Sequence, residues 1–486
     1  MSFNNVYSKI LSIGEVQRQS IISFMGQISF TFIGFLSTMY FAHTLGSGVL
    51  GAYFLFTAYY GIINLMSDGG FGGAAIKRIS EGEEQNEYFS TFFVLRSLFV
   101  TIVIFGLIAF QDYFVDFKEA GIFNWLLLAL IVSLIYGSVT SGIAGTGKMG
   151  IHATGNFINN ISRIAIQVVG VFLGYGVAGL IGGFIAGLLI ASIMELHFFN
   201  LRFKRFKWLH VKSLSSFSFW LFLTSAGVIL YSYVDTIMIG YYMSNSDVGI
   251  YRVVFQFASL ATLATVAIRT TLWPKVSRWG KVGDTNLIEK SLSKAFTYSL
   301  ILALPVCIGG ILLGERLLYF FYGSDFERGY LTLIVLLFVQ IVNVFQFFLT
   351  MYLGALDRQK DSFKVTAVAT AANIALNLIL IPIIGIEGAA LATLVTMSIN
   401  AMLAYRILSE IIDVKVDYSS AFNIFKAVFF MAILIELYLI IIPLSSIWTT
   451  LIPVFFGALV YVLLLLKYDQ EICSQLKEIA VKMNFI

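Results

Sequence analysis

Apolar stretches of about 20 residues follow one another along the whole chain, and short polar segments separate them. Stretches of this length match the thickness of a bilayer when helical, and they are far longer than the strands of a membrane barrel. The predicted fold class is therefore an all-α integral membrane protein with about 14 transmembrane helices. The predicted spans are 19–43, 46–67, 90–110, 122–143, 155–173, 176–199, 215–243, 248–272, 293–314, 331–355, 362–384, 386–408, 421–443 and 446–467.

The spacing of glycines divides these spans into two related halves. Three glycines of the first half recur in the second half at one constant offset: Gly145, Gly176 and Gly179 return as Gly354, Gly385 and Gly388. Such repeats are typical of transporters whose substrate site lies between the halves. The predicted domains are an N-terminal six-helix lobe, a basic cytoplasmic linker, a C-terminal six-helix lobe, and an appended helix pair with a cytoplasmic tail, at 1–200, 201–214, 215–410 and 411–486.

The composition excludes a soluble globular protein, because 59% of the residues are hydrophobic and only 12% are charged. The net charge of +4 does not indicate nucleic-acid binding, because the basic residues gather in the loops on one side of the membrane. Loops on the other side carry only Lys118, Arg316 and Arg328. The positive-inside rule then places both termini in the cytoplasm of a multi-pass plasma-membrane protein. The largest basic cluster, at 202–212, fits this topology and contact with anionic lipid headgroups.

Motifs for catalysis, metals and cofactors are missing from the sequence. There is no HExxH, GxSxG or DxD motif and no set of Cys and His residues with metal-ligand spacing. Residues 142–148 fit the first seven positions of a phosphate-binding P-loop, but Met149 replaces the Ser or Thr that holds magnesium. Because this segment also joins two membrane spans, it predicts a turn. The protein is predicted not to be an enzyme and to use no cofactor.

Charged side chains inside the predicted spans are the strongest candidates for a function. Each costs roughly 2.5–3.5 kcal/mol at the centre of a membrane helix, so each should face water or a partner. Arg96, Arg163 and Arg252 are predicted to capture an anionic headgroup, because guanidinium groups bind phosphate oxygens in pairs. Pairing with a carboxylate or snorkelling is the alternative, and it suits Arg96 best. Glu195 lies near the cytoplasmic end of its span, where it can snorkel.

Two aspartates are candidates for a cation site. Asp235 lies midway along its span and is predicted to line a cavity or to couple a cation, with a structural ion pair to Arg252 as the alternative. Asp68 opens the sequence Asp-Gly-Gly-Phe-Gly-Gly, which is predicted to break the second span. The break lies either beside a transport cavity or in a loop at the membrane edge.

Amide side chains add further candidates. Asn343 and Gln346 are three residues apart and share one helix face, and Asn377 lies in the following span. All three are predicted to bind substrate in an aqueous cavity. Hydrogen bonds between helices are the alternative.

Five segments carry a family resemblance: Leu45–Tyr53 (LGSGVLGAY), Asp68–Ser80 (DGGFGGAAIKRIS), Asp235–Gly240 (DTIMIG), Asp247–Tyr251 (DVGIY) and Gly385–Ala390 (GIEGAA). Through them, and over about residues 15–465, the chain resembles the polysaccharide and oligosaccharide flippases of the multidrug/oligosaccharidyl-lipid/polysaccharide exporter superfamily. The segment from Asp68 to Gly82 is particularly similar to archaeal members.

The resemblance implies an alternating-access transporter with two six-helix lobes around a V-shaped cavity. Its substrate would be a polyprenyl-diphosphate-linked oligosaccharide, moved from the cytoplasmic to the outer leaflet and coupled to an ion gradient or the membrane potential. The partners implied are this lipid-linked glycan, membrane lipids, Na+ or H+, and glycan-assembly proteins. The alternative is a cation-coupled multidrug or small-molecule exporter of the same superfamily, with Asp235 or Asp68 as its ion site. A glycan polymerase is disfavoured, because the outward loops are too short to carry catalytic residues.

Overall fold

The structure of the chain, a computed structural model, describes residues 15–113 and 121–474. Within these ranges the chain forms α-helices and short 3-10 turns and no strand, so the all-α class is confirmed. Lys118 and the tail from residue 475 on lie outside the described residues. The helices are α2 (Glu15–Asp68), α3 (Phe71–Ser80), α4 (Gln85–Ala109), α6 (Phe123–Gly145), α7 (Met149–Phe172), α8 (Gly176–Leu196), α9 (Trp208–Tyr242), α10 (Asn245–Ala258), α11 (Leu263–Val282), α12 (Thr285–Tyr322), α13 (Tyr330–Ala355), α14 (Gln359–Ser409), α15 (Tyr418–Ile441) and α16 (Ile447–Tyr468), with 3-10 turns η1 (Gln111–Tyr113), η2 (Ser259–Thr262) and η3 (Ser324–Gly329).

Eleven helical segments of the described residues are long and apolar enough to cross a membrane, so the chain is a multi-pass membrane protein. α2 and α14 each contain two of the predicted spans, which meet at a kink with non-helical backbone angles. The kink in α2 is at Gly46 (φ 76°), and the kink in α14 is at Gly385 (φ 66°). Glycine adopts such left-handed angles without the strain that a Cβ would cause. α7 is not among the eleven segments, because polar side chains interrupt its apolar sequence.

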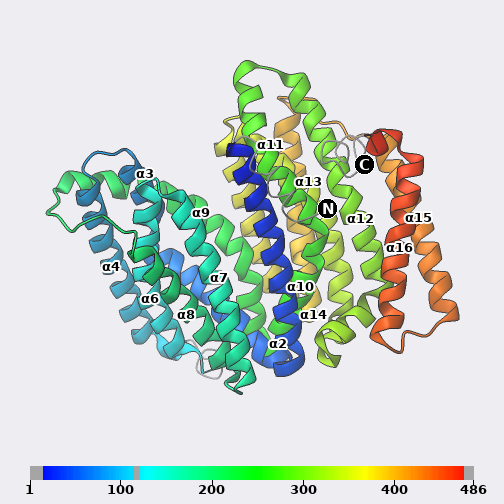
Figure 1. Cartoon of the computed structure of the whole chain (residues 1–486), viewed down its shortest axis with the longest axis horizontal. Coiled ribbons are helices and arrows are strands. Elements are labelled where there is room, and N and C mark those ends of the chain that lie inside the picture. The colour runs from blue at the N-terminus through cyan, green and yellow to red at the C-terminus, as the bar shows by residue number, and fades with distance from the viewer. Residues whose placement is uncertain (1–14, 114–120, 475–486) are drawn as a thin grey trace, which may run out of the picture.

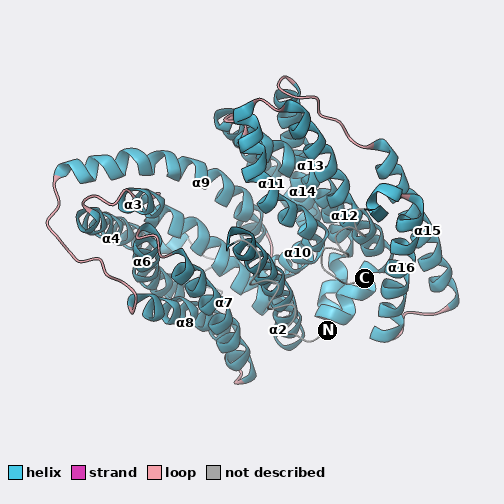
Figure 2. Cartoon of the chain, turned by 45° about the horizontal axis from the view of Figure 1, so that its top comes forward, coloured by secondary structure: helices cyan, strands magenta, loops and turns pink. Residues whose placement is uncertain are grey.

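Figure 1 shows α3, α4, α6, α7 and α8 gathered on one side of the molecule and α10 to α14 on the other. α15 and α16 lie at the outer edge, where both pack against α12. α2 contacts α10 as well as α6, α7 and α8, while α9 contacts α3 and α14, so these two helices connect the groups. In Figure 2, α9 is one long, curved helix that runs from the first group towards the second. It begins at Trp208, so the second half of the linker predicted at 201–214 is helical.

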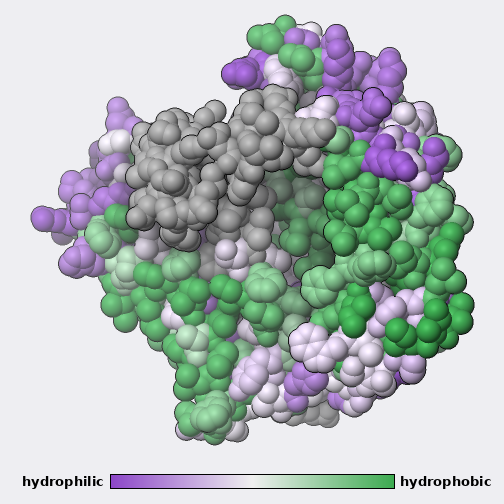
Figure 3. Space-filling model, turned by 45° about the vertical axis from the view of Figure 1, so that its right-hand side comes forward, coloured by the Kyte–Doolittle hydropathy of each residue, from purple (hydrophilic) through white to green (hydrophobic). Residues whose placement is uncertain are grey.

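The outer surface has the polarity of a membrane protein. Figure 3 shows a broad apolar surface, with hydrophilic side chains gathered towards the top of the view and a hollow beside the apolar region. Large apolar side chains of α15 and α16 are exposed, for example Phe425 and Phe455. A bilayer covers such surfaces in a multi-pass protein.

α2 and α10 meet with their backbones in direct contact. A Cβ at Gly51 would lie 1.6 Å from the carbonyl oxygen of Asn245, and a Cβ at Gly249 would lie 2.0 Å from that of Ser47. No side chain fits in either place, so the two glycines allow direct contact between the backbones. This contact lies near the kink of α2, at the lower end of the molecule in Figure 1.

Glu195 of α8 corrects one expectation, because its side chain is completely buried and does not snorkel. Thr140 of α6 donates a hydrogen bond to its carboxylate, and His152 Nδ1 of α7 lies 4.0 Å away. A Cβ at Gly155 would lie 2.1 Å from Glu195 Oε1, so the carboxylate fills the space that this glycine leaves. Snorkelling was predicted from the position of Glu195 near the end of a span, but the sequence does not show that α6 and α7 pack over its side chain.

Candidate functional site

A cavity of about 380 Å³ lies where α2, α7, α8, α9 and α10 meet. Two of the three predicted arginines line it: Arg163 of α7 and Arg252 of α10. Arg96 does not. Aromatic, amide and hydroxyl side chains form much of the remaining lining, among them Thr38, Tyr53, Phe54, Tyr60, Gln167, Phe184, Tyr233 and Gln256.

Neither guanidinium group in this cavity is neutralised by a carboxylate. Both arginines are half-buried, and neither is in an ion pair with a carboxylate of the described residues. Arg163 Nη2 donates to Asn160 Oδ1 at 3.0 Å, while its buried Nε has no hydrogen-bond partner. Arg252 Cζ lies 5.7–5.9 Å from the centres of three aromatic rings. Since none of the described residues that line the cavity is acidic, its positive charge can attract an anion.

Hydrogen-bonding groups accompany the two arginines. Gln167 Nε2 donates to Tyr53 Oη at 3.0 Å, and Thr38 Oγ1 donates to Gln256 Oε1 at 3.3 Å. Neither glutamine was among the site residues predicted from the sequence. Each follows one of the cavity arginines by four residues and so shares its helix face, which is the signal that identifies them.

Asp235 of α9 is buried and does not line this cavity. Three neutral groups donate hydrogen bonds to its carboxylate: Tyr251 Oη (2.8 Å) and Thr393 Oγ1 (2.9 Å) to Oδ2, and Asn377 Nδ2 (2.7 Å) to Oδ1. The alternative of an ion pair with Arg252 is not found within the described part of the chain. The carboxylate is therefore held by α10 and by both halves of α14 without a cationic partner.

Further oxygen atoms surround Asp235. Asn377 Oδ1 is buried without a hydrogen-bond partner, although the same side chain donates to Asp235 and to Asn373. Thr396 lies next to Asn373, whose Nδ2 donates to its hydroxyl at 3.4 Å. A carboxylate among amide and hydroxyl oxygens is chemically suited to a hard cation or a proton.

Asn343 and Gln346 of α13 lie elsewhere, and neither lines the cavity. Asn343 Nδ2 donates to Gln340 Oε1 at 3.3 Å within α13, and Gln346 Nε2 donates to Asn400 Oδ1 of α14 at 3.2 Å. Of these two candidates, Gln346 makes the helix-to-helix hydrogen bond that was the alternative interpretation.

Arg96 and Asp68 form a separate ion pair. Arg96 Nη1 lies 3.3 Å from Asp68 Oδ1, and its Nη2 donates to the carbonyl oxygen of Ser133 at 3.1 Å. The guanidinium occupies the space left by Gly137, where a Cβ would lie 2.1 Å from Nη1. Asp68 ends α2, and its Oδ2 accepts from the backbone N–H of Gly72 at 3.2 Å as α3 begins. The segment is thus a break between two helices, fixed by Arg96.

Arg96→Ala is expected to destabilise the protein by about 3 kcal/mol, because it leaves Asp68 partly buried without its cation and opens a void next to Gly137. Thermal unfolding of the purified protein in detergent measures this loss. Arg78→Ala is the matched control, because Arg78 forms a more exposed ion pair with Glu81 and its loss should cost about 0.5 kcal/mol or less. Equal melting temperatures for the two variants would contradict the structural role of Arg96.

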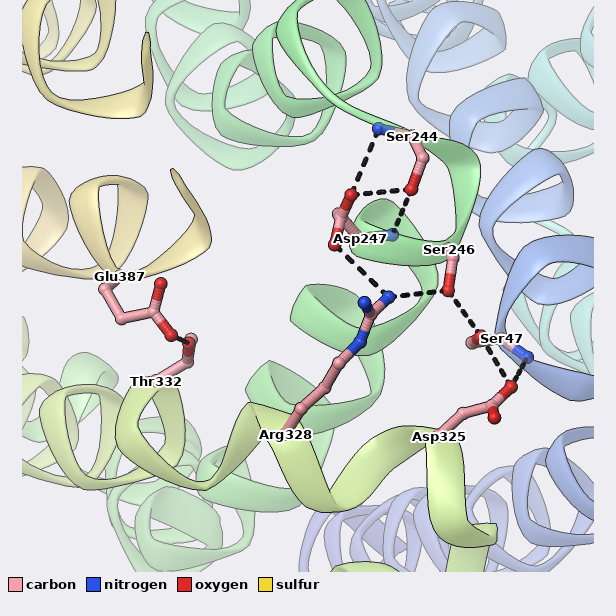
Figure 4. Close-up of polar contacts among 8 residues, drawn as sticks. All are labelled: Ser47, Ser244, Ser246, Asp247, Asp325, Arg328, Thr332 and Glu387. Atoms are coloured by element: carbon pink, nitrogen blue, oxygen red, sulfur yellow. Dashed lines mark hydrogen bonds and ion pairs between the residues drawn. The ribbon is translucent and has the colours of Figure 1, made fainter. Parts of the chain in front are cut away.

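A polar network joins the two groups of helices beside the Gly51–Gly249 contact (Figure 4). Ser47 of α2 donates through Oγ to Asp325 Oδ2 at 2.9 Å and lies 2.6 Å from Ser246 Oγ of α10. Arg328 Nη2 donates to Ser246 Oγ at 2.8 Å and lies 3.3 Å from Asp247 Oδ1. These contacts close this end of the molecule.

Comparison with known proteins connects this arrangement to a family. The sequence profile of the family described as "Polysaccharide biosynthesis protein" matches residues 16–279, which is more than half of the chain. The chain belongs to this family. The MatE profile also matches residues 221–379, in the second half. The superfamily resemblance that the sequence motifs indicated is thereby confirmed.

Two curated relatives of this polysaccharide biosynthesis protein are similar over nearly its whole length. The "Probable low-salt glycan biosynthesis flippase Agl15" of Haloferax volcanii is 28% identical, with 94% of this chain and 96% of the relative aligned. The "Probable flippase AglR" of the same organism is 25% identical, with 96% of this chain and 98% of the relative aligned.

Solved structures of related proteins have the same fold. The lipid II flippase MurJ in its inward closed conformation matches with a TM-score of 0.75 and 20% identity, covering 93% of this chain and 100% of that chain. An inward-facing multidrug transporter of the MATE family matches with a TM-score of 0.62 and 13% identity, covering 78% of this chain and 94% of that chain. At these identities the comparison establishes a MurJ- and MATE-like fold.

Proposed function

We propose that this protein is a flippase that moves a polyprenyl-diphosphate-linked oligosaccharide from the cytoplasmic to the outer leaflet by alternating access. The observation that carries the proposal is the pair of guanidinium groups, Arg163 and Arg252, in a cavity whose described lining contains no acidic side chain. Membership of a polysaccharide biosynthesis family and the names of the two Haloferax relatives support it.

The chemistry of the substrate fits this cavity. A diphosphate cannot enter hydrocarbon alone, because burying an unpaired charge is very costly. Guanidinium groups reduce that cost by binding phosphate oxygens through two parallel hydrogen bonds. The amides and hydroxyls around Arg163 and Arg252 suit hydrated sugars, and the polyprenyl chain would remain in the lipid. Enzymes that assemble the glycan on the cytoplasmic leaflet would supply the substrate.

The proposed topology has fourteen crossings. α2 and α14 each cross twice, on either side of their kinks, and α7 crosses despite its polar side chains. The residues before and after 201–214 then form two six-helix lobes, with α15 and α16 appended. Both termini lie in the cytoplasm of a plasma-membrane protein, because the basic loops face that side. The end closed by Ser47 and Asp325 is the outer end.

Proteoliposomes test the proposed function. Purified protein is reconstituted with a fluorescent diphosphate-linked glycolipid, and an external glycosidase reports how much of it reaches the outer leaflet. Faster exposure than in protein-free vesicles supports the flippase. An unchanged rate, measured with protein whose fold is verified by its thermal transition, would refute it.

A second candidate is a cation-coupled exporter of small molecules, favoured by the aromatic side chains of the cavity and by the MatE match. This function predicts that the same vesicles extrude a cationic dye under a Na+ or H+ gradient and leave the glycolipid unmoved. The two positive charges of Arg163 and Arg252 disfavour cationic substrates in this cavity.

Gly51→Leu is expected to hold the outer end open. The new side chain would collide with the backbone of Asn245, and about 1.4 kcal/mol against the closed state already changes its population tenfold. Transport should then fall by about tenfold or more, because alternating access needs both states. Spin labels at Phe110 and Glu315, near the outer ends of α4 and α12, should report a longer distance.

Gly48→Leu serves as the control in the same helix, because a Cβ at Gly48 has no atom within 4 Å. Both variants are prepared in a background without Cys307 and Cys473, so that only the introduced cysteines carry labels. If the label distance stays the same with Leu at position 51, the α2–α10 contact is not the outer closure.

A further inference from the structure

Apolar and polar side chains lie on different faces of α7. Apolar side chains such as Phe157 (51% exposed), Ile161 (37%) and Phe172 (81%) form an exposed face. Polar residues three or four positions apart form another face, which we call the α7 polar stripe: His152, Asn156, Asn160, Arg163 and Gln167. The end of the stripe packs closely against α8, where Gln167 donates to the carbonyl oxygen of Leu180 at 2.7 Å.

The position of the stripe is fixed by its last two members, because Arg163 and Gln167 line the cavity. Asn160 and Asn156 lie about one and two turns before Arg163 on the same face, outside the cavity lining and towards the turn that joins α6 and α7. Asn156 is exposed and Asn160 half-buried. Accessible amides on a membrane helix call for water or a polar ligand, because hydrocarbon cannot satisfy these groups.

Hydrogen bonds hold the stripe in place. Asn160 Oδ1 accepts from Arg163, and Asn160 Nδ2 donates to the carbonyl oxygen of Asn156 at 2.9 Å. Tyr136 Oη of α6 donates to Asn156 Oδ1 at 3.0 Å, and Asn156 Nδ2 lies 3.3 Å from His152 Nε2. An amide has two donor hydrogens and an oxygen with two lone pairs, so each asparagine keeps free hydrogen-bonding capacity after these contacts. The amides are therefore pre-oriented and still able to bind a ligand.

We infer that the α7 polar stripe is a binding track for the sugars nearest the diphosphate. With the diphosphate at Arg163, the glycan extends along Asn160 and Asn156 to His152, and the helix offers one polar side chain about every 5–6 Å. Amides hydrogen-bond to sugar hydroxyls through both their donor and acceptor groups. This inference rests on the proposed function and assigns the glycan-binding part of the same site.

Two probes separate sugar binding from diphosphate binding: farnesyl diphosphate, which carries no sugar, and farnesyl diphosphate linked to di-N-acetylchitobiose. Binding to the purified full-length protein is measured by calorimetry. The wild type should bind the glycosylated probe about tenfold more tightly, which corresponds to one or two net hydrogen bonds. The double variant Asn156→Ala with Asn160→Ala should lose this preference, with a smaller loss of affinity for farnesyl diphosphate, because Arg163 loses its hydrogen bond to Asn160.

Control variants make the result interpretable. Ile161→Ala on the exposed apolar face should keep the preference, and Asn156→Ser with Asn160→Ser should restore part of it by returning hydroxyl groups. Equal affinity of the wild type for both probes, or an equal loss for both probes in the double alanine variant, would overturn the sugar track. Failure of the wild type to bind farnesyl diphosphate at all would instead refute the diphosphate site of the proposed function.

Discussion

Arg252→Ala is expected to weaken binding of a diphosphate lipid by about 10–100-fold, because a charge-assisted hydrogen bond contributes about 1.5–3 kcal/mol. Arg252 lines the cavity and has no carboxylate within ion-pair distance among the described residues, so its removal takes away positive charge that can bind an anionic ligand. Transport in proteoliposomes should fall at least in proportion. Farnesyl diphosphate binding and glycolipid flipping are measured on the same preparation.

Two further variants show whether the lost affinity for the diphosphate lipid comes from the binding site. Arg316→Ala removes an exposed arginine that pairs with Glu327 at 3.4 Å, and it should leave binding unchanged. Arg252→Lys keeps the charge but loses the planar fork, so its affinity should lie between those of the wild type and the alanine variant. Unchanged affinity in Arg252→Ala, at normal expression and melting temperature, would remove Arg252 from the binding site.

Much of the fold could be predicted from hydrophobicity alone. Each predicted span overlaps a helix of the structure, because a stretch long enough to cross a bilayer has few alternatives to helix. The sequence also marked the break after Asp68, where Gly69 and Gly70 have φ angles of 57° and 77°. The boundary between the spans predicted at 362–384 and 386–408 was marked as well, because Ile384 and Gly385 have non-helical backbone angles within α14.

The site was less predictable, because helix rotation decides which residues meet. Arg96 pairs with Asp68 inside its own group of helices, as the carboxylate-pairing alternative expected for it, but the sequence did not show that Arg163 and Arg252 line one cavity. Tyr251 and Thr393 were not predicted as hydrogen-bond partners of Asp235 for the same reason. Tyr251 is 16 positions from Asp235 and Thr393 is 158 positions from it, so no local spacing connects either residue with the aspartate.

α10 links the three parts of the molecule that the proposed cycle requires. Its first turns carry Ser246 and Gly249 in the closed outer end, Tyr251 holds Asp235, and Arg252 enters the cavity. Loss of a cation from Asp235 would therefore act on the helix that also carries the cavity residue Arg252. Such a shared rigid element gives a physical route by which cation binding could bias the two states of the transporter.

If Asp235 holds a coupling cation, Asp235→Asn should remove the response of transport to the gradient of that cation. The substitution keeps the size of the side chain but removes the negative charge, and it places an NH2 group among three hydrogen-bond donors. A cation that binds only the folded state stabilises it by about 2.7 kcal/mol at 100 times its Kd. The wild type should therefore melt at a higher temperature in Na+ than in choline, and Asp235→Asn should melt equally in both.

Asp413→Asn is the control, because Asp413 lies in the loop between α14 and α15 and forms an exposed pair with Lys415. It should keep the Na+ response of the wild type. If the wild type shows no Na+ response, but an imposed pH gradient drives transport in the wild type and not in Asp235→Asn, the coupling ion is the proton. Gradient-driven transport that survives in Asp235→Asn would assign coupling elsewhere, since a neutral amide cannot supply the charge that binds either ion.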